Sequence, residues 1–102
     1  MLYYRIMKGY WIAKANIKDR DTFKRYSELA GPAITKHGGK FLARGGKSET
    51  LEGNDFERIV IIEFKDYDSA KKCFNSPEYQ EALTFSKKSS IRDLCLVEGQ
   101  AD

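Results

Sequence analysis

The sequence has little of what builds metal centres or covalent catalytic sites. Its 102 residues include two cysteines and one histidine, and these do not stand at the spacings typical of a zinc site. It also lacks a phosphate-binding loop, a dinucleotide-binding glycine motif and the elements of a catalytic triad. No apolar run approaches the roughly 20 residues that a membrane-spanning helix needs. We therefore expect no metal, no cofactor and no membrane contact.

Charge of one sign is not in large excess either. The chain has 18 basic and 15 acidic residues, a net charge of +3, and the two signs are mixed along it. Because nucleic-acid binding needs a basic stripe on one face, we expect no nucleic-acid partner. The strand pattern at 59–64, IVIIEF, carries one aromatic residue, too few for the base-stacking strand of an RNA-recognition domain.

The two ends of the sequence indicate the limits of the domain, and the cysteines indicate its cellular compartment. The first six residues are too short and too polar for a signal peptide, and Met7 is as good an initiator as Met1. We expect an optional extension at 1–6, a single domain at 7–99 and a tail at 100–102. Cys73 and Cys95 lie in apolar patterns, which predicts buried, reduced thiols in a cytoplasmic protein.

What the sequence does contain is a regular alternation of strand and helix patterns. The apolar strand at 59–64 is predicted to be central in a sheet. Gly31-Pro32 predicts a kink or two abutting helices, and Gly45-Gly46 predicts a bulge beyond which 47–51 continue a strand. In chain order we expect a strand at 10–17, a helix capped by Asp19 or Asp21 and ended at Gly38, strands at 40–44 and 59–64, a short helix capped by Asp66, a helix beginning at Ser76-Pro77, and a strand at 93–98.

This βαββαβ order is the split pattern of the ferredoxin-like fold, an α+β architecture with a four-stranded antiparallel sheet and helices on one face. Alternation predicts which side chains face the helices: Val60, Ile62, Phe64, Phe41, Ala43, Cys95 and Val97. The opposite face is predicted to carry Leu42, Arg44, Ile59, Ile61, Glu63, Leu94, Leu96, Glu98, Ile12 and Lys14. Because so apolar a face is costly to leave in water, we expect a homodimer through this open face, with the enclosed space for chemistry between the two sheets.

Six motifs occur in a characteristic order: MKGYWI at 7–12, HGGKFLARGG at 37–46, LEG at 51–53, IIEF at 61–64, SPEYQ at 76–80 and LVEG at 96–99. Together they resemble the family named domain of unknown function 1330, over nearly the whole chain. The resemblance implies a ferredoxin-like protomer that pairs as a dimeric α/β barrel. Related barrel families include cofactor-independent monooxygenases, muconolactone-type isomerases and haem-binding enzymes, so the fold does not select a function. Relatives tend to carry an arginine in the last helix where this chain has Ser86, which would weaken an anion site there.

Arg44 is the strongest candidate for ligand binding. Its guanidinium offers a planar fork for a carboxylate, and its position at a strand end is predicted to face the barrel interior. The alternative is a structural ion pair with Glu63 or Glu98, of either subunit, that fixes the register of the dimer.

Three side chains are candidates for catalytic proton transfer: His37, Glu63 and Tyr26. His37 is the only side chain that ordinarily titrates near neutral pH, although a histidine before a glycine helix stop also caps the last carbonyls. A carboxyl such as that of Glu63, in an otherwise apolar strand, has a raised pKa unless it is paired. Pairing with Lys14 is the simpler alternative, on the expectation that the first and third strands run parallel.

Trp11, Tyr26 and Tyr79 are candidates for lining a pocket and stacking on a flat ligand, or else are plain core. Two functions therefore stay open. One is a cofactor-independent enzyme, of isomerase or monooxygenase type, acting on a small organic acid or carbonyl compound. The other is a non-catalytic dimeric module that binds a metabolite or another protein.

Overall fold

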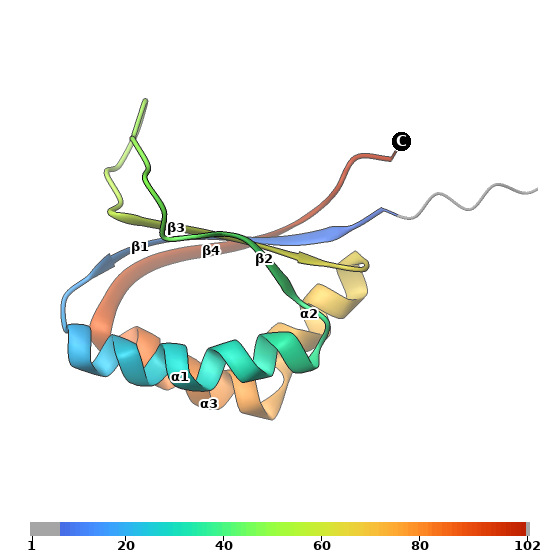
Figure 1. Ribbon diagram of the computed structural model, residues 1–102, viewed down its shortest axis with the longest axis horizontal. Helices are drawn as coiled ribbons and strands as arrows, with labels where there is room; N and C mark the ends of the chain where they lie inside the picture. The colour runs from blue at the N-terminus through green and yellow to red at the C-terminus, as the bar shows by residue number, and fades with distance from the viewer. Residues whose placement is uncertain (1–6, 102) are drawn as a thin grey trace, which may run out of the picture.

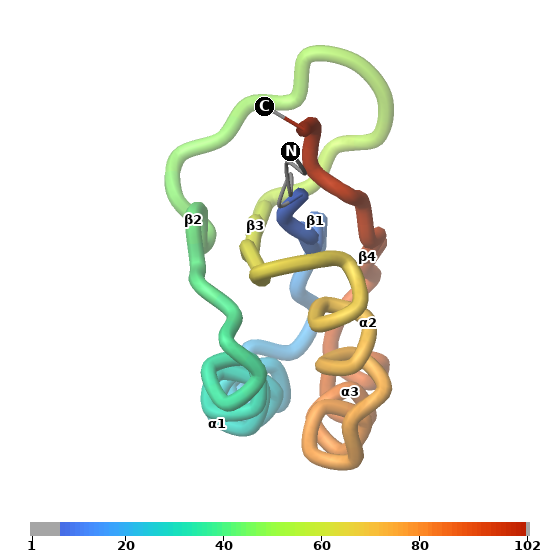
Figure 2. The backbone as a smooth tube through the Cα atoms, turned by 90° about the vertical axis from the view of Figure 1, so that its right-hand side faces the viewer, coloured from blue at the N-terminus to red at the C-terminus, as the bar shows by residue number. Residues whose placement is uncertain are grey.

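The protein is a two-layer structure with helices on one face of a four-stranded sheet (Figures 1 and 2). The computed structural model describes residues 7–101, so the predicted extension at 1–6 lies outside the described residues. The sheet has the order β2-β3-β1-β4, and all neighbouring strands are antiparallel. This is the predicted ferredoxin-like fold, with β3 central. Its elements are β1 (Gly9–Ile17), α1 (Arg20–Lys36), β2 (Lys40–Arg44), β3 (Arg58–Phe64), α2 (Tyr67–Asn75), α3 (Pro77–Ser89) and β4 (Ser90–Glu98).

The helix α1 is capped at both ends by residues that the sequence indicates. The Asp19 carboxylate accepts the backbone N–H of Thr22 at 3.2 Å, and Gly38 leaves the helix with a φ of 80°, which glycine adopts without steric cost. The prediction of two abutting helices is wrong, because α1 continues through Pro32 as one helix. Pro32 is exposed, so the carbonyl one turn earlier, which a proline leaves without its donor, can bind water instead.

The two shorter helices begin as predicted. The Asp66 carboxylate accepts the backbone N–H of Ser69 at 2.7 Å, and the Ser76 hydroxyl accepts that of Tyr79 at 3.3 Å. Pro77 then occupies the first position of α3, where a missing N–H costs nothing. The hydrogen bond from Ser69 lowers the pKa of Asp66 below its ordinary value of 3.8.

The Asp66 cap is expected to stabilise the fold in a way that disappears in acid. Because the folded-state pKa is lowered, the contribution is fully present above pH 3.8 and is lost as the pH falls through the folded-state pKa. Asp66→Ala should lower the thermal midpoint by a few degrees at pH 7, and its difference from the wild type should shrink toward pH 3. Circular dichroism measures both midpoints, with Asp68→Ala as the control. A pH-independent difference would contradict this expectation.

A bulge in β2 reverses the predicted direction of two side chains. The register between β2 and β3 shifts at Leu42, so that Phe41 pairs with Ile62 and Ala43 with Ile61. Because the extra residue offsets the alternation, Ala43 joins the uncovered face and Arg44 the helix-covered face, the opposite of the prediction. The bulge was expected at Gly45-Gly46 with a further strand at 47–51. Those residues instead begin a loop that rises on the uncovered side of the sheet (Figure 1).

The faces of β4 are also the reverse of those predicted. Trp11, which is buried on the helix-covered face of β1, pairs with Leu96. Both Leu94 and Leu96 pack against the core. Cys95 and Val97 therefore lie on the uncovered face, and by the same alternation Glu98 does not. The prediction failed because this strand is almost equally apolar on both faces, and only its register with β1 distinguishes them.

The two cysteines lie in different environments. Cys73 is buried as predicted, whereas Cys95 is exposed; both are free thiols. Burial raises the pKa of the Cys73 thiol to about 12, so this thiol stays protonated at neutral pH. Cys73 is therefore a small core residue and not a nucleophile.

Aromatic rings form the centre of the core. The Trp11 ring centroid lies 4.8 Å from that of Tyr79 and 5.3 Å from that of Phe64. The indole N–H donates to the carbonyl of Ala70 at 2.9 Å, which attaches β1 to α2. Trp11 is 2% exposed and Tyr79 is fully buried, so these rings hold the helices on the sheet.

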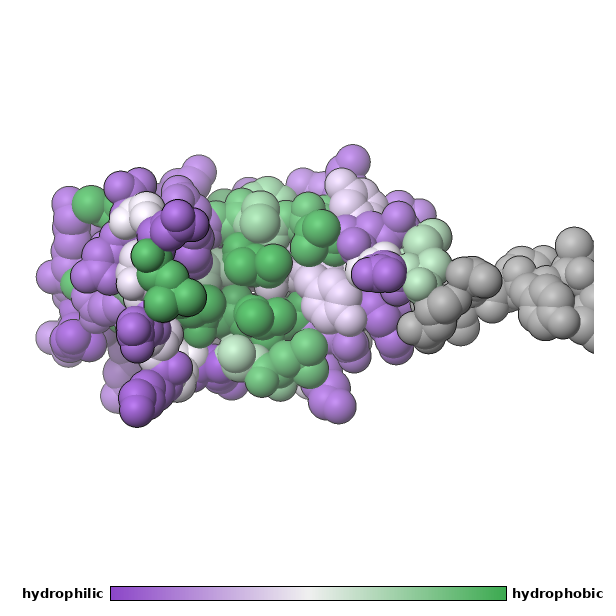
Figure 3. All heavy atoms as spheres, turned by 90° about the horizontal axis from the view of Figure 1, so that it is seen from above, coloured by the Kyte–Doolittle hydropathy of each residue, from purple (hydrophilic) through white to green (hydrophobic). Residues whose placement is uncertain are grey.

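The uncovered face of the sheet is apolar over its middle (Figure 3). Within it, Val97 and Ile91 are 44% and 54% exposed, and Ile61 is half-buried at its centre. We call this surface the open face; its apolar members are Ile12, Ala43, Ile59, Ile61, Ile91, Cys95 and Val97. A contiguous apolar surface of this kind usually marks a protein interface.

Candidate functional site

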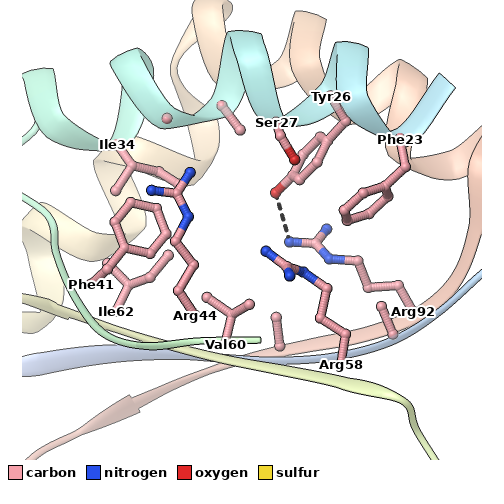
Figure 4. A pocket seen from close by; sticks show the side chains of 14 residues that line it. Phe23, Tyr26, Ser27, Ile34, Phe41, Arg44, Arg58, Val60, Ile62 and Arg92 are labelled. Atoms are coloured by element: carbon pink, nitrogen blue, oxygen red, sulfur yellow. Dashed lines mark hydrogen bonds between the residues drawn. The ribbon is translucent and has the colours of Figure 1, made fainter. Parts of the chain in front are cut away.

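A cavity lies between the sheet and α1, inside one protomer (Figure 4). Ala13 and Ala15 of β1 form its floor, and Ala30 and Gly31 of α1 contribute to its roof. Because alanine has a small side chain and glycine has none, a cavity that is partly open to solvent remains between the sheet and the helix. The sequence-based expectation that the enclosed space lies between two subunits is therefore wrong for this cavity.

Three arginines from three strands point into this cavity. Ala15 pairs with Arg58 of β3 on one side and with Arg92 of β4 on the other, so two arginines flank one alanine in a single row of the sheet. In Figure 4 both guanidiniums occupy the same end of the cavity, below Tyr26. Arg44 of β2 enters the other end, so that guanidiniums line the cavity at both ends.

Arg92 is fixed by a buried pair of phenols. Its Nη2 donates to Oη of Tyr26 at 2.9 Å and to Oη of Tyr79 at 3.0 Å, and the two phenol oxygens are 2.9 Å apart. Its Nη1 lies 3.5 Å from the hydroxyl of Ser86. Arg92 thus supplies a guanidinium beside Ser86, the helix position at which the resemblance predicted a weakened anion site.

Arg44 and Arg58 are positioned by aromatic and glycine neighbours. The Arg44 guanidinium lies over the Phe41 ring, 3.9 Å from its centroid, which favours the cation. A Cβ at Gly31 would lie 3.6 Å from Arg44 Nη2, so the guanidinium lies close to Gly31 of α1 with room for a methyl group between them. Gly45 has a φ of 70°, and a Cβ there would overlap the Arg58 guanidinium; glycine satisfies both constraints.

The three cavity arginines have no acidic partner among residues 7–101. The ion pairs in this part of the chain are Arg20–Glu57, Lys36–Glu78 and His37–Glu78. Burial, and secondarily the positive charge of Arg44, lower the pKa of Arg58. A partly buried cluster of like charges without a counter-ion in the protein favours an anion from solution.

Tyr26, one of the candidates for proton transfer, lines this cavity and has a raised pKa. Burial is the main cause, followed by the nearby Tyr79, so the phenol of Tyr26 stays protonated at neutral pH. Tyr79 lies behind it in the core and reaches the site through Arg92. Of the residues predicted from the sequence, the structure thus brings Arg44, Tyr26 and Tyr79 together.

His37, Glu63 and Trp11 do not line the cavity. His37 is at the end of α1, with its Nε2 2.8 Å from Glu78 Oε1, and this contact lowers the pKa of Glu78. Trp11 lines a separate apolar hollow beside α2.

Glu63 lies on the open face and accepts a hydrogen bond from the Tyr10 hydroxyl at 3.1 Å. The expected pair of Glu63 with Lys14 is wrong, because β1 and β3 are antiparallel and Lys14 pairs with Ile59, at the opposite end of β3. Lys14 lies instead over the Phe56 ring, 5.4 Å from its centroid. Arg44 faces away from Glu63, so no ion pair forms between them within one protomer.

Arg58, Arg92 and Ser27 also line the cavity, and none of them was predicted from the sequence. Arg58 lies two residues before Val60 and four before Ile62, both of which were correctly predicted to face the helices. Extending the alternation by one more step would therefore have placed Arg58 on that face. Arg92 lay outside the predicted strand at 93–98, because β4 begins at Ser90, and the even-numbered residues of that strand were assigned to the open face. Ser27 carries no signal of its own in the sequence.

In the described part of the chain, no three His, Cys, Asp or Glu side chains come together as a metal site would need. Nor does any helix within residues 7–101 have the length and apolar character to cross a membrane.

The fold and the cavity define a ferredoxin-like α+β protein with an arginine-lined pocket under its longest helix. The chain belongs to the family described as domain of unknown function 1330 (DUF1330), whose model matches residues 8–100. Among curated proteins, none matches the sequence significantly.

Solved structures share the fold at low identity. A protein of unknown function from Rhodopseudomonas palustris has a TM-score of 0.72 and 17% identity, covering 92% of this chain and 82% of that one. SnoaB, a cofactor-independent oxygenase from Streptomyces nogalater, has a TM-score of 0.62 and 11% identity, covering 92% and 94%. A dimeric protein of unknown function with a ferredoxin-like fold from Bacteroides fragilis has a TM-score of 0.59 and 14% identity, covering 94% and 99%. At these identities the likeness establishes the fold alone.

Proposed function

We propose that the cavity under α1 binds a small organic acid, and that the protein works as a homodimer. The observation that carries the first part is the group of three guanidiniums without a carboxylate partner in residues 7–101. Apolar walls from Phe23, Phe41 and Ile34 would take the body of the ligand, as in small-molecule sites generally.

The residues of the pocket would hold an acid without a cofactor. Arg58 and Arg92 would bind the carboxylate through charge-assisted hydrogen bonds. If the Tyr79 hydroxyl is the donor in its hydrogen bond to Tyr26, the Tyr26 hydroxyl is free to donate a hydrogen bond to a second ligand oxygen. The apolar floor at Ala13 and Ala15 would exclude water beneath the ligand.

The residues that line the pocket favour binding of an acid over abstraction of a proton from it. Its lining side chains that ionise are three arginines and one tyrosine, and the tyrosine pKa is raised by burial. None of these groups is a base at neutral pH. An enzyme built on this pocket would therefore act by orienting an acid whose own chemistry supplies the reactivity, as a cofactor-independent oxygenase or isomerase would. The likeness in fold to SnoaB, a cofactor-independent oxygenase, is consistent with that alternative.

Isothermal titration calorimetry with benzoate and its neutral amide, benzamide, tests the binding proposal. The two ligands have nearly the same shape and differ in charge. We expect benzoate to bind at least about tenfold more tightly, because only the carboxylate satisfies the guanidiniums. Equal affinity of the acid and the amide would contradict an anion site.

The proposed dimer would form through the open face. The isoleucines of the open face are half-exposed, and the loop at 45–57 rises on the same side of the sheet (Figure 1). A second copy could pack its own open face against this apolar surface. The Bacteroides fragilis protein with this fold is dimeric. Burial of such a face in a second copy removes its apolar area from water.

Ile61→Glu is expected to convert the dimer to a monomer. Ile61 lies on β3 at the centre of the open face, and an uncompensated carboxylate cannot be buried there without a large cost. Light scattering coupled to size-exclusion chromatography measures the mass at micromolar concentration. Thr84→Glu, which adds the same charge on the exposed side of α3, should leave a dimer. A monomeric wild-type protein would refute the proposed interface.

A further inference from the structure

We infer that the ligand of the pocket carries two carboxylates joined by a short apolar spacer, a dicarboxylic acid. This inference rests on the proposed function and adds a substrate class to it. One carboxylate would be held by Arg58 and Arg92, and the other by Arg44. The positions of the three arginines in the sheet support this division.

The first end of the pocket is a two-arginine clamp. Arg58 and Arg92 stand on either side of Ala15 in one row of the sheet, and the alanine side chain leaves the space between them empty. Arg92 cannot swing away freely, because Tyr26 and Tyr79 both hold its Nη2. A carboxylate above Ala15 would meet donors from both sides, and the Tyr26 hydroxyl lies directly beside them (Figure 4).

The second end of the pocket belongs to Arg44. Arg44 pairs with Val60, two residues beyond Arg58 on β3, which places its row about 6.6 Å farther along the strands. Its guanidinium lies on Phe41 and close to Gly31 of α1, and in Figure 4 it occupies the side of the pocket opposite Tyr26. The arginines therefore form two cationic groups, not one.

The lining between these groups carries no further charge and is largely apolar. Ala13, Val60 and Ile62 lie on the sheet side, and Ala30 lies on the helix side together with the neutral hydroxyl of Ser27. Methylene groups or a small ring fit such a lining, and further charges do not. A single phosphate held by Arg58 and Arg92 would leave Arg44 without an anionic partner. The arrangement therefore favours two separated carboxylates, and a spacer of two to four carbons, which extends roughly 4–6 Å, matches the distance between the rows.

Calorimetric titration with matched pairs of acids tests the inference. Succinate, glutarate and adipate are compared with butyrate, valerate and hexanoate, and with inorganic phosphate. We expect at least one diacid to bind tenfold or more tightly than the monoacid of the same length. Arg44→Gln should reduce the affinity for that diacid at least tenfold and the affinity for the monoacid no more than threefold. Arg44 is exposed at the pocket mouth, so the variant should fold normally.

Lys40→Gln is the control, because Lys40 is an exposed cation on the same strand whose pairing with Glu63 places it on the other face. The Lys40→Gln variant should change the affinities for the diacid and for the monoacid by no more than twofold. Equal binding of diacids and monoacids, or equal losses of both in Arg44→Gln, would overturn the dicarboxylate inference while leaving the acid site intact. Tighter binding of phosphate than of every diacid would overturn it as well. If no acid of either kind binds, the proposed function itself is wrong.

Discussion

Arg58→Gln is expected to weaken benzoate binding about 30-fold or more without lowering the thermal midpoint of the ligand-free protein. The loss in affinity follows from removing a charge-assisted hydrogen bond of about 2 kcal/mol. The second effect follows from the pKa of Arg58, which burial and the charge of Arg44 lower. A lowered pKa means that the folded protein disfavours the cation, so the charge destabilises the ligand-free fold.

Calorimetry measures the first effect and thermal unfolding the second. Arg25→Gln is the matched control, because it removes the same charge from the exposed surface of α1 and should leave benzoate affinity within about twofold. An Arg58→Gln variant that binds benzoate normally would remove Arg58 from the site. A variant that loses stability and binding together would instead indicate a structural arginine.

Trp11→Phe is expected to lower the free energy of unfolding by about 1–3 kcal/mol while leaving benzoate affinity unchanged. The substitution leaves a void beside Tyr79 and Phe64, and it removes the indole N–H that bonds the carbonyl of Ala70. Trp11 lies in the core and outside the lining of the arginine pocket. Its effect should therefore be on stability alone.

Chemical denaturation gives the stability, and titration of the folded variant gives the affinity. Trp11→Ala would cost about 3–5 kcal/mol, enough that the variant could fail to fold, which is why phenylalanine is the informative change. Weaker benzoate binding at undiminished stability would restore the ligand-binding role that the sequence predicted for Trp11.

The overall fold could be predicted because its signals are local. Asp19, Asp66 and Ser76 cap helices where short polar side chains before an apolar periodic stretch indicate a start. Gly38 ends α1 because a positive φ is needed there. Signals of this kind depend on a few neighbouring residues, so they hold before any tertiary contact is known.

The site was harder to predict because it depends on which way each strand faces. The bulge at Leu42 turned Arg44 from the open face to the helix side, and no residue type marks that position. In β4, Leu94 and Cys95 are both apolar, so only pairing with β1 decides which one is buried. The bulge in β2 and the facing of β4 place Arg44 and Arg92 on the side covered by α1, so the candidate site lies there and not at the expected dimer interface.

A crystal structure of the complex with benzoate shows whether the anion site lies under α1. We expect the carboxylate above Ala15, with its oxygens about 2.7–2.9 Å from nitrogens of Arg58 and Arg92, and the ring under α1. Benzoate bound against the open face between two subunits, or an arginine cluster closed by a carboxylate of the protein itself, would contradict it.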